Sequence, residues 1–114
     1  MIINYLAMYI KMGTEELNEK VVECLQTIFD PEIPVSIYDL GLIYKVEILP
    51  IGNVQVLMTL TAPSCPAAQS IPIEVDQKVR ALEGVNDVNV TVTWTPKWDK
   101  SMMSETAQLE LGML

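Results

Sequence analysis

The sequence predicts one α+β domain, a single αββαβ unit with a small three-stranded mixed sheet, helices packed on one face and a C-terminal helical tail. Two patterns predict it. Apolar residues recur at helical spacing in two segments, and they alternate with polar residues in three others. The 114 residues suit one compact domain, and 50% hydrophobic residues against 19% charged ones are enough to form a core.

The first helix is expected over residues 14–29. Its apolar face is marked by Leu17, Val21, Cys24, Leu25 and Ile28. Thr14 can cap this helix, and Asp30-Pro31 should end it because proline disfavours helical geometry in the residue before it. The domain is therefore expected to span residues 13–114, with residues 1–12 as an N-terminal extension. The apolar stretch of that extension is too short to cross a bilayer and follows no basic residue, which argues against a targeting role.

A hairpin should follow, with strands over residues 42–48 and 54–60 and a turn over 50–53. Along the first strand, Leu42, Tyr44, Val46 and Ile48 alternate with Ile43, Lys45 and Glu47. The second helix should begin at Pro66, a residue that the first turn tolerates because it needs no amide donor there, and it should stop before Gly84. Its apolar face is marked by Ile71, Val75, Val79 and Leu82.

Residues 87–94 show the cleanest alternation and predict the third strand. Val88, Val90, Val92 and Trp94 should face the core, and Asp87, Asn89, Thr91 and Thr93 should face water. A right-handed crossover would make the second and third strands parallel, with room for the first between them. A short helix is expected over residues 104–111.

Charge and composition exclude several classes of function. With a net charge of −8, the chain offers no basic face for nucleic acid, and an anionic membrane would repel it. The chain has no histidine, so it cannot form a Ser-His-Asp or Cys-His pair, and one copy cannot supply four cysteine or histidine ligands to a metal. Two cysteines are too few for a disulfide scaffold, which favours reduced thiols in a cytoplasm. We therefore expect a protein that is not an enzyme.

Cys65 is the sharpest chemical feature. It directly follows a predicted strand and occupies the expected N-cap of the second helix, where backbone amides and the helix dipole favour a thiolate. Position alone leaves a reactive thiol and an inert, half-buried one equally open. Cys24 lies on the apolar face of the first helix, where a core role is expected.

Four further residues could belong to a site with Cys65. Asp30 and Glu32 flank Pro31, Asp39 precedes Leu40-Gly41, and Thr61 stands four residues before the cysteine. Carboxylates near a thiol could act as hard ligands or orient a partner. Each could instead be structural, because Asp-Pro and Asp-x-Gly sequences are common in turns and threonine is a good strand residue.

Four segments, taken in order, resemble a known family. They are Asp30-Pro-Glu-Ile-Pro-Val-Ser-Ile-Tyr-Asp-Leu-Gly-Leu-Ile-Tyr44, Leu57-Met-Thr-Leu-Thr-Ala-Pro-Ser-Cys-Pro66, Trp94-Thr-Pro-Lys-Trp98 and Met103-Ser104. Together they are similar to the iron–sulfur cluster assembly domain family of SufT, which also includes the eukaryotic cytosolic iron–sulfur targeting factor and PaaD. The likeness runs from about residue 13 to residue 112. PaaD-type members add a cysteine-rich tail, and no cysteine follows Trp98 here, which disfavours that branch.

The resemblance implies an αββαβ fold and an accessory role in the maturation of iron–sulfur proteins. It places the family's reactive cysteine on Cys65, its acidic motif on Asp30 and Glu32, its threonine on Thr61 and its Asp-Leu-Gly stretch on Asp39. No tightly bound cofactor is expected, only transient iron or an iron–sulfur cluster held by Cys65. A cluster is usually held by four protein ligands, so a second chain in a homodimer, or a client, must share the ligation.

The expected partners are the iron–sulfur assembly machinery and client apoproteins. A metal-free adaptor that recruits clients through residues 94–103 is the main alternative, and its acidic surface would select basic partners. A thiol-dependent enzyme is a weaker alternative because no histidine base and no nearby second cysteine support it.

Overall fold

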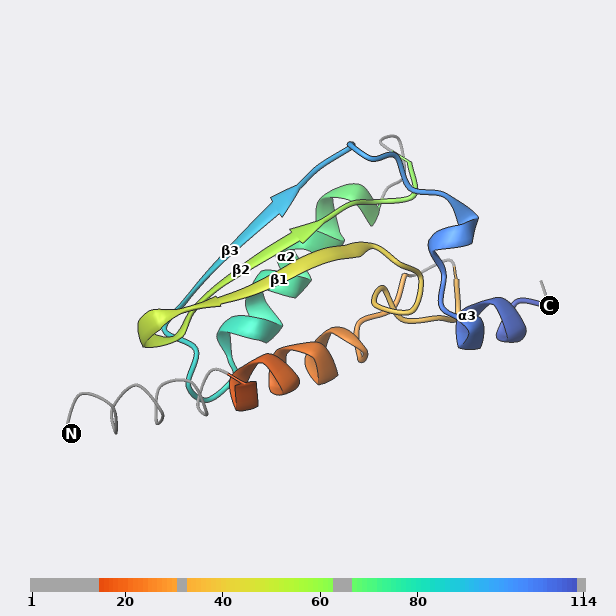
Figure 1. Cartoon of the computed structure of the whole chain (residues 1–114). Helices are drawn as coiled ribbons and strands as arrows, with labels where there is room; N and C mark the ends of the chain where they lie inside the picture. The colour runs from red at the N-terminus through yellow and green to blue at the C-terminus, as the bar shows by residue number, and fades with distance from the viewer. Residues whose placement is uncertain (1–14, 31–32, 63–66, 113–114) are drawn as a thin grey trace.

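A computed structural model describes residues 15–30, 33–62 and 67–112 of the chain (Figure 1). A helix over residues 15–25 comes first, then strand β1 (Ile43–Leu49), the 3₁₀ turn η1 (Pro50–Gly52) and strand β2 (Asn53–Met58). Helix α2 (Ala67–Arg80), strand β3 (Asp87–Val92), the 3₁₀ turn η2 (Lys100–Met102) and helix α3 (Glu105–Glu110) complete it. The predicted αββαβ order and the short C-terminal helix are confirmed.

The sheet has the order β1-β2-β3, with β1 antiparallel and β3 parallel to β2. The prediction of parallel second and third strands is confirmed, but the expectation that the first strand lies between them is wrong. β2 is central because its inward side chains Val54, Val56 and Met58 are fully buried, whereas β1 buries its side chains only in part. A bulge in β1 is also typical of an edge strand.

That bulge changes which side chains of β1 face the core. Ile43 pairs with Met58 and Lys45 with Leu57, so the register shifts across Tyr44. Ile43 therefore packs against the core with Val46 and Ile48, while the predicted alternation had placed Tyr44 in that set. Tyr44 instead reaches the C-terminal segment, where its hydroxyl donates to the Pro96 carbonyl at 2.8 Å.

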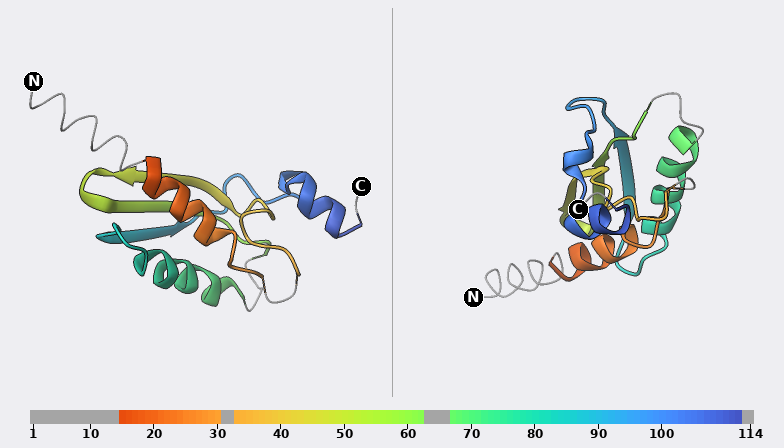
Figure 2. Two further views of the ribbon diagram at one scale, coloured as in Figure 1. Left: turned by 90° about the horizontal axis from the view of Figure 1, so that it is seen from below. Right: turned by 90° about the vertical axis from the view of Figure 1, so that its right-hand side faces the viewer.

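Both long helices lie on the same side of the sheet, as Figure 2 shows. Their apolar faces meet the inward face of the sheet in one core. The fully buried members from the two helices are Val21, Leu25, Ile71, Val75 and Val79, and Ile28, just after the first helix, joins them. The opposite face of the sheet is polar over Lys45, Gln55, Asn89 and Thr91. Within the described ranges, no helix has the length and apolar character needed to cross a membrane.

The first helix is shorter than predicted. It ends at residue 25, and a turn follows over residues 26–27. The chain then leaves the helix axis because Phe29 pairs with Ser36 in an isolated β-bridge, next to an Ile37 amide that donates to the Ile28 carbonyl at 2.8 Å. Cys24 packs partly buried against the core, and this burial raises the pKa of its thiol.

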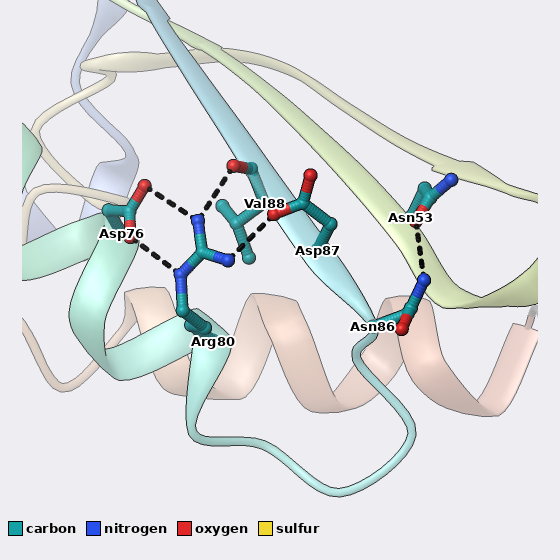
Figure 3. A network of polar contacts seen from close by, with 6 residues as sticks. All are labelled: Asn53, Asp76, Arg80, Asn86, Asp87 and Val88. Carbon is teal, nitrogen blue, oxygen red and sulfur yellow. Dashed lines mark hydrogen bonds and ion pairs between the residues drawn. The ribbon is translucent and has the colours of Figure 1, made fainter.

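A polar network joins the end of α2 to the start of β3 (Figure 3). The Arg80 guanidinium donates to Asp76 at 3.0 Å, to Asp87 at 2.6 Å and to the Val88 carbonyl at 3.1 Å. The hydrogen bond from Arg80 is the main reason that the pKa of Asp87 lies below its ordinary value. The network therefore fixes how the crossover helix meets its strand.

Arg80→Gln should lower the unfolding midpoint at neutral pH by a few degrees, within roughly 5 °C. Because the pKa of Asp87 is lowered in the folded state, its ion pair stabilises the fold above the pKa of the unfolded chain. That contribution is lost as pH falls through the lowered pKa. Thermal unfolding followed by circular dichroism should show wild type and variant converging in acid. Lys78→Gln, which breaks a Glu74 pair within one helix, serves as the control. An undiminished difference in acid would contradict this role for Asp87.

Candidate functional site

Two of the five predicted site residues, Cys65 and Glu32, lie outside the described residues, as does Pro66, the expected first residue of the second helix. Asp30, Thr61 and Asp39 are described. The predicted proximity of Cys65 to the acidic loop therefore stays a prediction.

The described neighbours of these positions meet at one end of the sheet. Thr61 follows the carboxyl end of β2, and the Thr93 amide after β3 donates to the Met58 carbonyl at 2.8 Å. Figures 1 and 2 show the start of α2 and the loop over residues 33–42 at this same end. The carboxyl ends of adjacent parallel strands are where open α/β sheets commonly bind ligands.

Asp30 is a buried carboxyl group, with 6% of its surface exposed. Its backbone carbonyl accepts a hydrogen bond from the Ile33 amide at 3.3 Å. A carboxylate in so enclosed a position is costly unless polar groups surround it. The acidic motif therefore begins inside the fold, next to the core, and not on an open surface.

Asp39 connects two segments that lie far apart in the sequence. One carboxylate oxygen accepts from the Ser36 hydroxyl at 3.2 Å, and the other accepts from the Ser104 hydroxyl at 3.1 Å. The Ser104 amide also donates to the Asp39 carbonyl at 2.8 Å, and the Ser104 hydroxyl caps α3 through the Ala107 amide. Asp39 thus positions the C-terminal helix, and a contact between its carboxylate and Cys65 stays untested.

The segment over residues 94–103 folds back on this end of the sheet. The Trp98 indole N–H donates to the Leu40 carbonyl at 2.8 Å, and Tyr44 holds Pro96. Gly41, with φ of +81°, lets this segment approach, because a side chain there would overlap the Met102 carbonyl oxygen. The prediction that Trp94 faces the core together with the valines of β3 is wrong. Trp98 packs against the core, whereas Trp94 is 44% exposed.

A shallow hollow of about 510 Å³ lies where Thr61 meets this segment, and it is lined by Thr61, Lys97, Trp98, Asp99 and Lys100. The sequence interpretation missed the two lysines. The sequence does hold a signal for them. Lys20, Lys78 and Arg80 each pair with an acid four residues away on the same helix, whereas Lys97 and Lys100 have no acid at that spacing.

Thr59 stands two residues before Thr61, and the sequence allows its hydroxyl to lie beside Cys65, although threonine is also a good strand residue; that proximity stays a prediction. The Thr59 side chain is fully buried at the end of β2, and its hydroxyl has no hydrogen-bond partner in the part of the chain that the structure describes. Within that same part, no group of three acidic or cysteine side chains gathers closely enough to hold a metal ion. The described residues alone therefore do not form a metal site.

The fold and this end of the sheet define a class, a small α+β domain of the SufT-like αββαβ type. The profile of the family described as iron-sulfur cluster assembly protein matches residues 18–92, and the chain belongs to this family. The matched residues include the predicted site, from Asp30 to Cys65.

Two relatives and one solved structure agree. The chain is 52% identical over 99 residues to an Fe-S protein maturation auxiliary factor of Porphyromonas gingivalis, covering 87% of this chain and 94% of that one. It is 37% identical over 86 residues to the Fe-S protein maturation auxiliary factor SufT of Staphylococcus aureus, covering 75% and 98%. A domain of unknown function from Bacillus anthracis has a TM-score of 0.83 at 34% identity, covering 91% and 99%. Both named relatives are auxiliary factors and not named enzymes.

Proposed function

We propose that this protein is an accessory factor in the maturation of iron–sulfur proteins, and that it carries iron or a cluster transiently through Cys65. One observation supports the proposal most. The family match spans Asp30, Glu32, Asp39, Thr61 and Cys65 in a single stretch. The expected location is the cytoplasm, and the expected partners are assembly proteins and client apoproteins.

The chemistry follows from the thiolate. A cysteine at the N-terminus of a helix has a lowered pKa, because amide groups and the helix dipole stabilise the negative charge. The thiolate is the form that binds iron. Thr61 and the buried Asp30 would limit the room around it, and Glu32 would add a hard oxygen ligand.

An incomplete ligand set suits a carrier. Cys65 alone, in a chain without histidine, cannot fill four ligand positions around a cluster, so the remaining ligands must come from a client or from a second copy of this chain. A site completed by the client hands over its cargo when the client's own cysteines replace the borrowed ligand. Release then needs no separate reaction.

Asp39 would act at a distance from the metal as a positioning residue. It holds Ser36 in the loop that follows the acidic motif, and it holds Ser104 at the start of α3. The loop and the C-terminal segment therefore share one support. A change at Asp39 should loosen both together.

The general proposal is tested in cells that lack this protein. The activity of an enzyme with a [4Fe–4S] cluster should fall, while the amount of its polypeptide and the activity of a cluster-free enzyme stay unchanged. Restoring the wild-type chain should restore the cluster-dependent activity. Equal loss of both activities would indicate a general effect and would contradict a maturation role.

An adaptor without metal is the second candidate, and one observation favours it. Residues 94–103 are fixed to the body of the domain through Tyr44, Trp98 and Asp39, so they present a preformed surface. Preformed surfaces bind partners with little cost in ordering. The two candidates differ in whether Cys65 is needed.

A further inference from the structure

The charges around the hollow at Thr61 differ from those elsewhere on the chain. Four of the six lysines and arginines that the structure describes lie within 4.0 Å of a carboxylate. Lys20 pairs with Glu16, Lys45 with Glu47 and Lys78 with Glu74, and Arg80 pairs with both Asp76 and Asp87. Lys97 and Lys100 are the two described cations without such a pair, and both line the hollow. The unpaired positive charge of the described chain is thus concentrated in one place.

The one acid in this hollow is held by its own turn. The Asp99 carboxylate accepts hydrogen bonds from the Ser101 amide at 3.1 Å and from the Ser101 hydroxyl, and so caps η2. These bonds are the main reason that the pKa of Asp99 is lowered, and Lys100 contributes least. Among the described residues, the Asp99 carboxylate lies within 4.0 Å of neither lysine's amino nitrogen, so no ion pair joins them.

The backbone that carries the lysines is fixed on both sides. The Pro96 carbonyl is bonded by Tyr44 just before Lys97, and Trp98 between the lysines is bonded to Leu40. Farther along, Met103 is buried and Ser104 is held by Asp39. A fixed backbone presents the two side chains in one region without the ordering cost of a flexible loop.

From this placement we infer that the hollow is a docking site for an acidic segment of a partner protein, with aspartate or glutamate carboxylates facing Lys97 and Lys100. The net charge of −8 repels an acidic partner from the rest of the surface. Docking is therefore directed to this one location. The partner class is opposite to the basic partners that the net charge alone predicts.

An acidic segment fits better than a nucleic acid. Duplex DNA carries about one negative charge per 1.7 Å, so a bound strand would extend past two lysines over a surface rich in acids. A segment with two or three carboxylates can end within the hollow. Trp98 adds an apolar surface beside the charges, which a protein side chain can contact.

The inference names the partner class for the maturation role, but it does not depend on whether Cys65 binds iron. The full chain is titrated with a peptide of four glutamates at low salt and followed by ¹⁵N–¹H NMR. The backbone amides of residues 97–100 and the Trp98 indole should shift, and added salt should weaken the effect. A peptide of four lysines, as the control of opposite charge, should leave these signals in place.

The matched variants change charge equally at two different places. Lys97→Glu with Lys100→Glu should weaken glutamate-peptide binding at least about tenfold. Lys20→Glu with Lys78→Glu, on the two helices, should weaken it less than about threefold. Equal weakening by both pairs, shifts spread over the whole surface, or tighter binding of a short oligonucleotide would each overturn the inference. Circular dichroism checks that every variant is folded.

Discussion

Cys65→Ser is expected to abolish the protein's contribution to cluster-enzyme activity in cells, while Cys24→Ser keeps most of it. Serine is close to cysteine in size but gives no thiolate at neutral pH, so it binds iron poorly. Cys24 packs partly buried on the first helix, and burial raises the pKa of its thiol, which favours the inert form. The measurement is the activity of a [4Fe–4S] enzyme in cells that carry each variant as the sole copy.

The paired design separates the two candidate functions. Both variants remove one sulfur and should reach similar abundance, so a difference in activity reports position and not cysteine content. Full activity of the Cys65 variant, with its partners retained in a pull-down, would favour the metal-free adaptor. Loss of activity in both variants at unchanged abundance would contradict the assignment of Cys24 to the core.

Trp98→Ala is expected to reduce the free energy of unfolding by about 2–3 kcal/mol. The substitution removes an indole that packs against the core and breaks its bond to the Leu40 carbonyl. Removal of a fully buried tryptophan side chain would cost more free energy of unfolding, but the Trp98 side chain is only partly buried. Urea unfolding followed by circular dichroism measures the change without relying on tryptophan fluorescence.

Trp94→Ala is the control for that experiment, because it removes the same side chain four residues earlier, where it is largely exposed. Its effect should stay within about 0.5 kcal/mol. Trp98→Phe should lie between the two, because it keeps much of the packing and loses the hydrogen bond. Equal destabilisation by both alanine variants would contradict the anchoring role of Trp98.

The elements of the fold were predictable where one period governs a long stretch. The valines of β3 alternate strictly, and Val88, Val90 and Val92 do pack against the core. Ser104 could be placed at the start of the last helix, where it caps α3. These features depend on local residue order, which the sequence displays directly.

Features that depend on contacts between distant segments were not predictable. The bulge at Tyr44 accompanies a hydrogen bond from its hydroxyl to the Pro96 carbonyl, more than fifty residues away. The early end of the first helix follows from the pairing of Phe29 with Ser36. Strand order depended on which strand could be buried on both edges, and alternation within each strand does not contain that information.

The candidate site was predictable in its residue types but not in its surroundings. A cysteine after a strand and an acidic turn are visible in the sequence. The hydrogen bonds that tie Asp39 to Ser104 are not, because they join residues 65 positions apart. The lysines of the hollow are an intermediate case, because the sequence shows that neither has a helical i, i+4 acid, but their place together beside Thr61 is a property of the folded chain.

Anaerobic reconstitution of the purified protein with iron and sulfide tests the central claim most directly. The Cys24→Ser protein, in which Cys65 is the one remaining thiol, should develop the visible absorbance of bound iron and sulfur and lose it to an apoprotein client. The Cys65→Ser protein should stay colourless under the same conditions. Equal absorbance in the two proteins would show that Cys65 does not ligate the cargo and would contradict the carrier role.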